Sequence, residues 1–534
     1  MAITRYLLAS LTLFWLVGCG GDQPQGGSGL VYCSEGNPET FNPQLTTSGT
    51  AIDATAKQLY NRLLSIDPTS GELVPELATA WSVSPDGLAY HFTLRQGVAF
   101  HSTDTFTPTR PFNADDVLFS FGRVIDPQHP YHSVSGGRYP YFQSIGLAAQ
   151  IARMERRSDH EVVFHLQKPN ASFLADLATD FAILLSAEYG EQLWQQGKPT
   201  QLDNQPVGTG PYRLSRYLRN RYVRYRPHPD YWGEPAPLDQ LVFDITPSST
   251  TRVVKLIGGD CDVAALPQIS ELAVIQRYDD LAVDTRPGLN VAFWAFNTQK
   301  PPLDDPRVRR ALSLAVDKRR LLTTVYQNTA VIGKGLLPPI SWAYDPSLPP
   351  FPHDPYRARQ LLESAGISEL ELDVWAMPIG RIYNPNAIKT AEILQQDMAN
   401  IGVKLNIVSY DWGGFISKLE HAEYDSVLIG WAADNLDPDN FFTPLLSCDA
   451  LISGSNRARW CDPEFDALMA QARATEDREA RKAIYRKLER RLQSQVPLLP
   501  LAHASRTLGR QRHWQGPILH TTGGVDFTRI RKEP

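Results

Sequence analysis

The sequence has few cysteines and lacks the familiar catalytic signatures. Only 5 cysteines occur in 534 residues, and none lies in a Cys-x-x-Cys or Cys/His spacing, which excludes the usual zinc sites. Neither Gly-x-Ser-x-Gly nor His-Glu-x-x-His is present. The stretch from Gly208 to Pro211 is not a phosphate loop, because its proline removes a donor and no Gly-Lys-Ser/Thr follows. We therefore predict no catalytic residues, no metal and no cofactor.

Extreme charge and a second long apolar run are also missing. The net charge of −6 argues against a general nucleic-acid binder, and no segment after the N-terminus is apolar for long enough to cross a membrane. What remains is an ordinary globular composition of 42% hydrophobic and 21% charged residues. At 534 residues the chain is too long for one hydrophobic core, so two or more domains are expected.

The first residues form a targeting segment. Arg5 precedes a mostly apolar run from Tyr6 to Val17, which is too short to span a bilayer and fits the core of a signal peptide. The run ends at Cys19 in Leu-Val-Gly-Cys, which resembles a bacterial lipobox, and residues 20–29 read as a flexible tether. We expect Cys19 to carry a lipid; the alternative is an ordinary cleaved signal with an incidental cysteine.

The remaining cysteines predict two disulfides. If Cys19 carries a lipid, an even number of cysteines is left in an exported chain. Cys448 and Cys461 would close a short loop, which stabilises the fold by about 3 kcal/mol in the chain-entropy model. Cys33 and Cys261 are then left to each other.

Two loops far apart in the sequence are the strongest candidates for a binding site. The stretches Trp375–Asn386 and Gly430–Asn440 each follow a short apolar run that reads as a strand. In an open α/β sheet, loops at the carboxyl ends of strands line the ligand crevice. The first loop carries a guanidinium, Arg381, which suits a carboxylate, and the second carries a carboxylate, Asp434, which suits an ammonium. Together they would hold the two ends of a zwitterion; the alternative is that they are surface charges or each other's ion-pair partners.

Other local patterns have structural explanations. Thr46–Thr50 precedes a helical pattern from Asp53 to Leu64, so its hydroxyl and N–H groups cap that helix, bind a ligand anion, or do both. Asn113 predicts a helix N-cap, with Asp115 and Asp116 favoured by the helix dipole rather than forming a catalytic pair. Further helices are expected over Val308–Val316, Tyr356–Glu363, Ala387–Ile401 and Thr475–Ser494. Strands are expected over Leu30–Cys33, Tyr90–Arg95, Asn290–Phe296, Glu371–Trp375 and Lys404–Val408.

Several motifs resemble one known family. They are Leu30–Phe41, Pro75–Ala78, Asn113–Phe121, Pro206–Tyr212, Asp230–Gly233 and Pro287–Ala292. Together they resemble the oligopeptide/dipeptide family of ABC-transporter substrate-binding proteins, solute-binding family 5, over the chain from about Leu30 to its end. Within this family the two loops resemble the dipeptide-binding branch. Val496–His503, Ser341–Asp345 and Cys461–Asp466 are more similar to the Sap-type branch.

This resemblance implies a fold. It is the α/β, two-lobed periplasmic-binding-protein fold of class II, cluster C, with an extra subdomain inserted in the first lobe. The implied divisions are a signal peptide at 1–19, a tether at 20–29, lobe 1 at 30–72, 196–287 and 503–534, the inserted subdomain at 73–195, and lobe 2 at 288–502.

The resemblance also implies a site and partners. Asp434 would hold the ligand ammonium and Arg381 its carboxylate, with Tyr383 and Trp412 as aromatic walls beside Gly430. Thr47, Ser48 and Gly49 would supply backbone contacts from lobe 1, and Tyr139 and Tyr141 would face the same crevice. The expected partners are a short peptide, most often a dipeptide, and the permease and ATPase of an ABC importer. The protein is expected to be a monomer in the periplasm, held to a membrane of the bacterial cell envelope only by its lipid.

Three alternatives remain open at this stage. The first is a Sap-type binder of antimicrobial peptides or of haem. The second is an exported hydrolase, which the missing motifs disfavour. The third is a receptor or chaperone of the same fold that works without a transporter.

Overall fold

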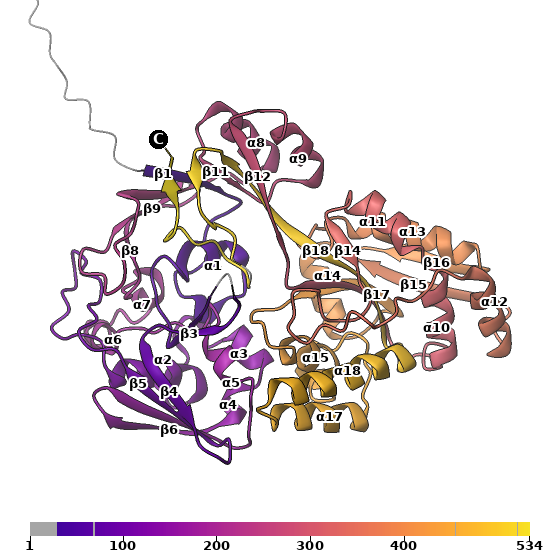
Figure 1. Cartoon of the computed structure of the whole chain (residues 1–534), viewed down its shortest axis with the longest axis horizontal. Coiled ribbons are helices and arrows are strands. Elements are labelled where there is room, and N and C mark those ends of the chain that lie inside the picture. The colour runs from indigo at the N-terminus through magenta and orange to yellow at the C-terminus, as the bar shows by residue number, and fades with distance from the viewer. Residues whose placement is uncertain (1–28, 68–69, 454, 521, 534) are drawn as a thin grey trace, which may run out of the picture.

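The computed structural model describes residues 29–67, 70–453, 455–520 and 522–533. Two lobes lie side by side in Figure 1, with the N-terminal half of the chain in one and residues from about 290 to 500 in the other. One long sheet runs through both lobes in the order β16-β15-β17-β13-β18-β11-β1-β10-β9-β8, and β12 and β14 also pair with β18. The mixed α/β, two-lobed architecture that we predicted is confirmed.

Lobe 1 is built around its half of this sheet. Strand β1 pairs in parallel with β10 and β11, and β10 pairs antiparallel with β9. Residues on alternate positions of β10 are buried, as expected for a strand with one covered face. The elements of this lobe are β1 (Gly29–Ser34), α1 (Gly49–Thr55), β2 (Leu64–Ile66), β3 (Leu73–Pro75), α7 (Gln201–Asn204), β8 (Tyr212–Leu218), β9 (Tyr222–Pro227), β10 (Gln240–Ile245), α8 (Ser249–Gly258), β11 (Val263–Ala265) and α9 (Ile269–Ile275).

A separate four-stranded sheet forms the inserted subdomain, in the order β4-β5-β7-β6. Asn113 caps its first helix as predicted, because its side chain accepts from the Asp115 N–H and Asp116 completes a capping box. The elements are β4 (Ala78–Val83), β5 (Ala89–Leu94), α2 (Ala114–Ile125), α3 (Pro140–Ser144), α4 (Leu147–Gln150), β6 (Ile151–Ser158), β7 (Glu161–Leu166), α5 (Phe173–Leu177) and α6 (Ala187–Gln195).

Lobe 2 alternates strands and helices, and β15 pairs in parallel with both β16 and β17. Its elements are β13 (Asn290–Phe296), α10 (Pro306–Ala315), α11 (Lys318–Val325), β14 (Ala330–Ile332), α12 (Pro355–Ser364), β15 (Leu370–Ala376), α13 (Ala387–Ala399), β16 (Val403–Val408), α14 (Trp412–Glu420), β17 (Ser426–Ala432), α15 (Asp439–Leu446), α16 (Ala450–Ser453), α17 (Pro463–Arg473) and α18 (Arg478–Gln495). The predicted helices and strands of this lobe lie within a few residues of the observed ones.

Two strands connect the lobes. Strand β12 (Leu281–Pro287) leads directly into β13, and β18 (Leu498–Gln511) returns, pairing first with β13 and then with β11 and β12. At the crossing, the Asn290 carboxamide donates to the Ala504 carbonyl at 2.8 Å and accepts from the Ala504 N–H at 2.9 Å. This side chain clips the outgoing strand to the returning one. The short β19 (Trp514–Gln515) and β20 (Arg531–Lys532) close the chain on lobe 1.

Each lobe has its own hydrophobic core. One large cluster of buried residues runs from Leu289 to Ala504, and the other gathers residues from Leu30 to Ala265 with Leu508 to Ile530. A partly buried side chain, Leu436, packs against both clusters. The two lobes therefore have separate hydrophobic cores, and Leu436 in the loop after β17 packs against both.

One predicted helix is wrong. The pattern from Asp53 to Leu64 forms α1 only as far as Thr55, and the chain then turns before β2. The carbonyls of Gln58 and Leu59 accept from the Tyr212 and Gly210 N–H groups instead of from helical neighbours. A side chain at Gly208 or Gly210 would collide with the Leu59 backbone, which explains why glycine occupies both positions.

Both predicted disulfides are present, Cys33–Cys261 and Cys448–Cys461. The first ties β1 to the residue two positions before β11, and the second closes a loop between α15 and α17. The predicted signal segment, the tether up to Ser28 and the lipidation site Cys19 lie outside the described residues. Within the described part of the chain, the helices are too short or too polar to traverse a lipid bilayer.

Candidate functional site

The two candidate loops leave neighbouring strands at the same edge of the lobe 2 sheet. Strands β15 and β17 are parallel and in direct register, with Trp375 opposite Val427. Residues 377–386 follow β15, and residues 433–438 follow β17 and precede α15. The sheet thus places the loop of Arg381 beside the loop of Asp434, as expected for the carboxyl ends of parallel strands.

The loop of Arg381 is a closed turn. The Arg381 N–H donates to the Asn384 carbonyl at 2.9 Å, and the Asn384 N–H donates back to the Arg381 carbonyl at 3.0 Å. The buried Asn384 side chain accepts from the Asn386 N–H and the Thr390 hydroxyl, which fixes the turn to the start of α13. Arg381, half-buried, therefore stands on a backbone that is held at both ends.

Tyr383 lies on the glycine of the neighbouring strand. A Cβ atom at Gly430 would overlap the Tyr383 ring and the Val291 carbonyl, so only glycine allows this approach. The Tyr326 hydroxyl donates to the Tyr383 carbonyl at 2.8 Å. Burial raises the pKa of Tyr383 to about 12, so its hydroxyl stays neutral. The structure thereby joins Tyr383 and Gly430, two of the predicted site residues.

Asp434 carries a half-buried carboxylate that has no cationic partner among the described residues. Its N–H donates to Asn440 Oδ1 at 3.2 Å, and it forms no ion pair with any residue in the described ranges. Burial raises the pKa of Asp434 to about 7, and the negative charge of Asp180 adds to the effect. The interpretation of Asp434 and Arg381 as mutual salt-bridge partners is therefore wrong.

Asp180, in the inserted subdomain, acts on Asp434 through its negative charge. Its Oδ1 atom accepts from Lys57 at 2.9 Å and from Arg62 at 2.8 Å. Burial alone would raise the pKa of Asp180, but these two cations outweigh it and lower the pKa below its usual value. Asp180 consequently remains ionised within an ion-pair cluster with Lys57 and Arg62, and its negative charge contributes to the raised pKa of Asp434.

The lobe 1 candidates Thr47, Ser48 and Gly49 stand at the start of α1. Thr47 and Gly49 are exposed, and Ser48 occupies the N-cap position without making a side-chain cap bond. The hydroxyls of the flanking residues already donate hydrogen bonds: that of Thr46 to Glu39 at 2.6 Å, and that of Thr50 to Glu35 at 2.7 Å. The backbone of this segment is thus the part that stays accessible.

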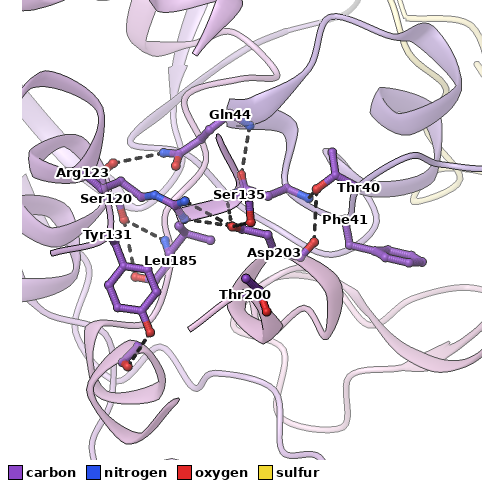
Figure 2. Close-up of polar contacts among 12 residues, drawn as sticks. Thr40, Phe41, Gln44, Ser120, Arg123, Tyr131, Ser135, Leu185, Thr200 and Asp203 are labelled. Atoms are coloured by element: carbon purple, nitrogen blue, oxygen red, sulfur yellow. Dashed lines mark hydrogen bonds and ion pairs between the residues drawn. The ribbon is translucent and has the colours of Figure 1, made fainter. Parts of the chain in front are cut away.

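Tyr139 is not brought together with Asp434. It is 1% exposed, its hydroxyl donates to the His132 carbonyl at 2.9 Å, and it accepts from Arg123 Nε. Arg123 in turn forms a fully buried ion pair with Asp203 at 2.9 Å, which also accepts from Ser135 (Figure 2). We correct the expectation for Tyr139: it supports the interior charge pair that joins the inserted subdomain to lobe 1.

Tyr141 does approach the site. Its hydroxyl donates to Asp176 Oδ1 at 3.3 Å, and burial, Asp176 and Asp434 all raise its pKa. The same Asp176 oxygen accepts from the Asn435 carboxamide at 3.0 Å. Sequence reasoning missed Asp176 and Asn435, because residues 259 positions apart in the chain leave no local signal of their contact.

The remaining features are the predicted wall residue Trp412, the predicted absence of a metal site, and a cavity in lobe 1. Trp412 begins α14, whose N-cap Asp411 accepts from the Gly414 N–H, but its side chain lies outside what the structure describes. Among the described residues, no cluster of three or more His, Cys, Asp or Glu could bind a metal ion. A polar cavity of about 210 Å³ lies within lobe 1, lined by Lys57, Arg62 and Tyr231 among others, and its lining does not include Arg381 or Asp434.

Comparison with known proteins matches residues 72–451 to the model of "Bacterial extracellular solute-binding proteins, family 5 Middle". The chain is 43% identical to the dipeptide-binding protein of Escherichia coli K12, covering 94% of each chain. It is 42% identical to the probable ABC transporter periplasmic-binding protein SapA of the same organism, covering 95% of this chain and 92% of SapA. It also resembles the crystal structure of a dipeptide binding protein from Pseudoalteromonas sp. SM9913 in complex with Met-Leu, with a TM-score of 0.85, 47% identity, and coverage of 95% and 100%.

Proposed function

The chain belongs to family 5 of the bacterial extracellular solute-binding proteins, and from this premise we propose that it captures short peptides, dipeptides above all, for an ABC importer. The ligand would lie between the two lobes. Asp434 would bind its ammonium group and Arg381 its carboxylate. The protein acts in this proposal as a binder and not as an enzyme.

The observation that carries the proposal is the carboxylate of Asp434, which has no cationic partner in the described part of the chain. Asp434 is half-buried, and a desolvated carboxylate is costly unless it is paired; the charge of Asp180 adds to that cost. A ligand ammonium would supply the missing charge. The neighbouring Arg381 loop would meet a carboxylate at the other end of the same ligand.

The fixed positions of the two loops would select peptides by their length. One extra residue extends a peptide by about 3.5 Å, which would pull one terminus from its partner. An unpaired terminal charge then costs several kcal/mol, enough to favour dipeptides over longer peptides. Tyr383 on Gly430 and the indole of Trp412 would form the walls, and the backbone of Thr47, Ser48 and Gly49 would contact the peptide from lobe 1.

Delivery follows from the two-lobed form. Closure of the lobes about β12 and β18 would enclose the peptide, and the closed form would be recognised by the permease and ATPase of the importer. A lipid on Cys19 would keep the monomer at the membrane on the periplasmic side. Treatment with a lipoprotein signal peptidase inhibitor would test this point, since only a lipoprotein precursor accumulates.

A ligand panel tests the proposal. Di-, tri- and longer peptides, a cationic antimicrobial peptide and haem are each added to the purified mature chain, and Tm is measured. A ligand that binds only the folded state raises Tm in proportion to the logarithm of its excess over Kd. We expect the largest shift from dipeptides. A shift from haem or from the antimicrobial peptide alone would favour the Sap-type alternative, and release of amino acids from any peptide would contradict a pure binder.

A further inference from the structure

A short segment of the inserted subdomain touches the loop that carries Asp434. The Ser172 hydroxyl donates to Asp437 Oδ1 at 3.0 Å and accepts from Arg481 Nη2 at 3.1 Å. The Ala171 N–H donates to the Arg473 carbonyl at 2.8 Å. Ser172 is 1% exposed, so this contact between the lobes excludes water. Figure 1 shows α5 of the inserted subdomain facing α15 of lobe 2.

Asp176 makes the second contact, directly beside the proposed ammonium site. One of its carboxylate oxygens accepts from Asn435 Nδ2 at 3.0 Å and from the Tyr141 hydroxyl at 3.3 Å. Asn435 is fully buried and is the chain neighbour of Asp434. The other end of its carboxamide accepts from the Asp437 N–H at 2.9 Å, which fixes the turn of the loop. The orientation of this loop thus depends on a residue of the opposite lobe.

Apolar packing reinforces the two polar contacts. Leu436, which follows Asn435 in the loop, packs against the hydrophobic cores of both lobes. Its Cδ1 atom approaches Gly71 of lobe 1 so closely that a Cβ there would lie at 3.0 Å. The three residues after Asp434 therefore each contact lobe 1 or its inserted subdomain: Asn435 through Asp176, Leu436 through Gly71, and Asp437 through Ser172.

The charges at this contact are unevenly balanced. Asp437 is paired with Arg481 at 2.9 Å and Asp439 with Arg473 at 2.9 Å, and both pairs lie within lobe 2. Asp176 has no ion pair with any residue in the described ranges. Burial raises the pKa of Asp176, Asp439 and Asp437 raise it further, and Arg473 opposes them only in part. In this contact Asp176 acts as a hydrogen-bond acceptor, for the Asn435 carboxamide and the Tyr141 hydroxyl.

We propose that the inserted subdomain positions the ammonium end of the ligand site, with Asp176 orienting Asn435 and thereby Asp434, and Ser172 completing the Asp437–Arg481 pair on closure. The inference rests on the proposed function. Its physical basis is that one loop both binds the ligand and bridges the lobes. Opening the lobes would break the Ser172 and Asp176 contacts, so ligand binding and closure would favour each other through this loop.

The test uses the purified mature chain and the dipeptide Met-Leu, with Asp176→Ala, Asp176→Asn and the control Glu161→Ala, an exposed carboxylate on β7 of the same subdomain. We expect Asp176→Ala to weaken binding at least tenfold, mainly through faster dissociation in stopped-flow measurements. X-ray scattering of the loaded variant should give a larger radius of gyration than that of the loaded parent protein. Asp176→Asn keeps the acceptor oxygen and should bind within about threefold, as should Glu161→Ala.

A coupling cycle separates positioning from general damage. If Asp176 acts through Asn435, the double variant Asp176→Ala/Asn435→Ala should bind no more weakly than the weaker single variant, because both remove the same contact. Unchanged affinity and dissociation rate in Asp176→Ala, or an equal loss in Asp176→Asn, would overturn the inference. Absence of Met-Leu binding by the parent protein would instead count against the proposed function, so the two failures can be distinguished.

Discussion

The ring of Tyr383 lies on Gly430, the glycine of the adjacent strand β17. This contact joins the two loops that together form the candidate site, one following β15 and the other following β17. Because Gly430 has no side chain, Tyr383 and the closed turn of Arg381 can settle onto the strand that leads to Asp434. The spacing between the guanidinium and the carboxylate should therefore depend on this glycine.

Gly430→Ala should weaken dipeptide binding at least tenfold and also lower the stability of the protein, because the added methyl group meets the Val291 backbone carbonyl as well as the Tyr383 ring. The added methyl group overlaps the Tyr383 ring, so the Arg381 loop must move. Calorimetric titration with Met-Leu measures the effect. Gly258→Ala is the matched control, because nothing lies within 4 Å of a Cβ at that helical position. Equal affinities in the two variants would remove Tyr383 from the site.

Dipeptide affinity should fall as the pH drops below 7. The pKa of Asp434 is raised to about 7, so the carboxylate that binds an ammonium is lost on acidification. Below that value the affinity should decline roughly tenfold per pH unit, and binding should release a proton. Titrations at several pH values in two buffers of different ionisation enthalpy measure both effects. Asp434→Asn should bind weakly at every pH, and a steep slope retained in that variant would assign the titration to another group.

Asn290→Ala should destabilise the protein at the crossing between the lobes. Asn290 is 1% exposed, and its loss leaves the N–H and carbonyl of Ala504 without their side-chain partner. The expected cost is about 1–3 kcal/mol in the free energy of unfolding, measured with urea. Asn204→Ala removes an exposed carboxamide that donates to the Thr200 carbonyl, and should change stability by less than about 0.5 kcal/mol. A difference no larger than that control would mean that the crossing is held by the strand ladder alone.

Arg123→Ala should lower the free energy of unfolding more than Asn290→Ala does. Its guanidinium is fully buried against Asp203, so truncation leaves an uncompensated buried carboxylate (Figure 2). Such a loss costs about 3–5 kcal/mol. Arg153→Ala breaks an exposed pair with Glu155 and should cost at most about 1 kcal/mol. Thermal and urea unfolding measure the stability of the two variants. Similar losses would contradict the structural role of the buried Arg123–Asp203 pair, and with it the assignment of Tyr139 to that pair.

Local patterns were the most predictable part of the structure. Strands with continuous or alternating burial, such as β13 and β5, carry their signal within a few residues, and the loops after β15 and β17 could be placed from the ends of those strands. The disulfide pairs followed from simple counting. The helix expected over Asp53 to Leu64 failed because the N–H groups of Tyr212 and Gly210, far along the chain, donate to the carbonyls of Gln58 and Leu59. Gly208 and Gly210 allow the close approach that these bonds need.

The site was predictable only where it depended on chain neighbours. Arg381 and Asp434 could be proposed because each belongs to a distinctive loop, whereas Tyr139 was misplaced because a tyrosine in sequence does not reveal which face it presents. The contacts of Asp176 with Asn435 and of Ser172 with Asp437 join residues separated by 259 and 265 positions. These contacts depend on how the two lobes pack against each other. The local pattern of residues along the chain carries no information about that packing.

The central claim is that Asp434 binds an ammonium and Arg381 a carboxylate at opposite ends of one dipeptide. Calorimetry of a chemical cycle tests it most directly, with Met-Leu, N-acetyl-Met-Leu and Met-Leu-amide each titrated into the parent protein, Asp434→Asn and Arg381→Ala. We predict that acetylation costs the parent at least tenfold, or about 1.4 kcal/mol, but costs Asp434→Asn almost nothing, and that amidation behaves in the same way with Arg381→Ala. If each modification costs the variants as much as it costs the parent, the two side chains do not hold the ends of the ligand.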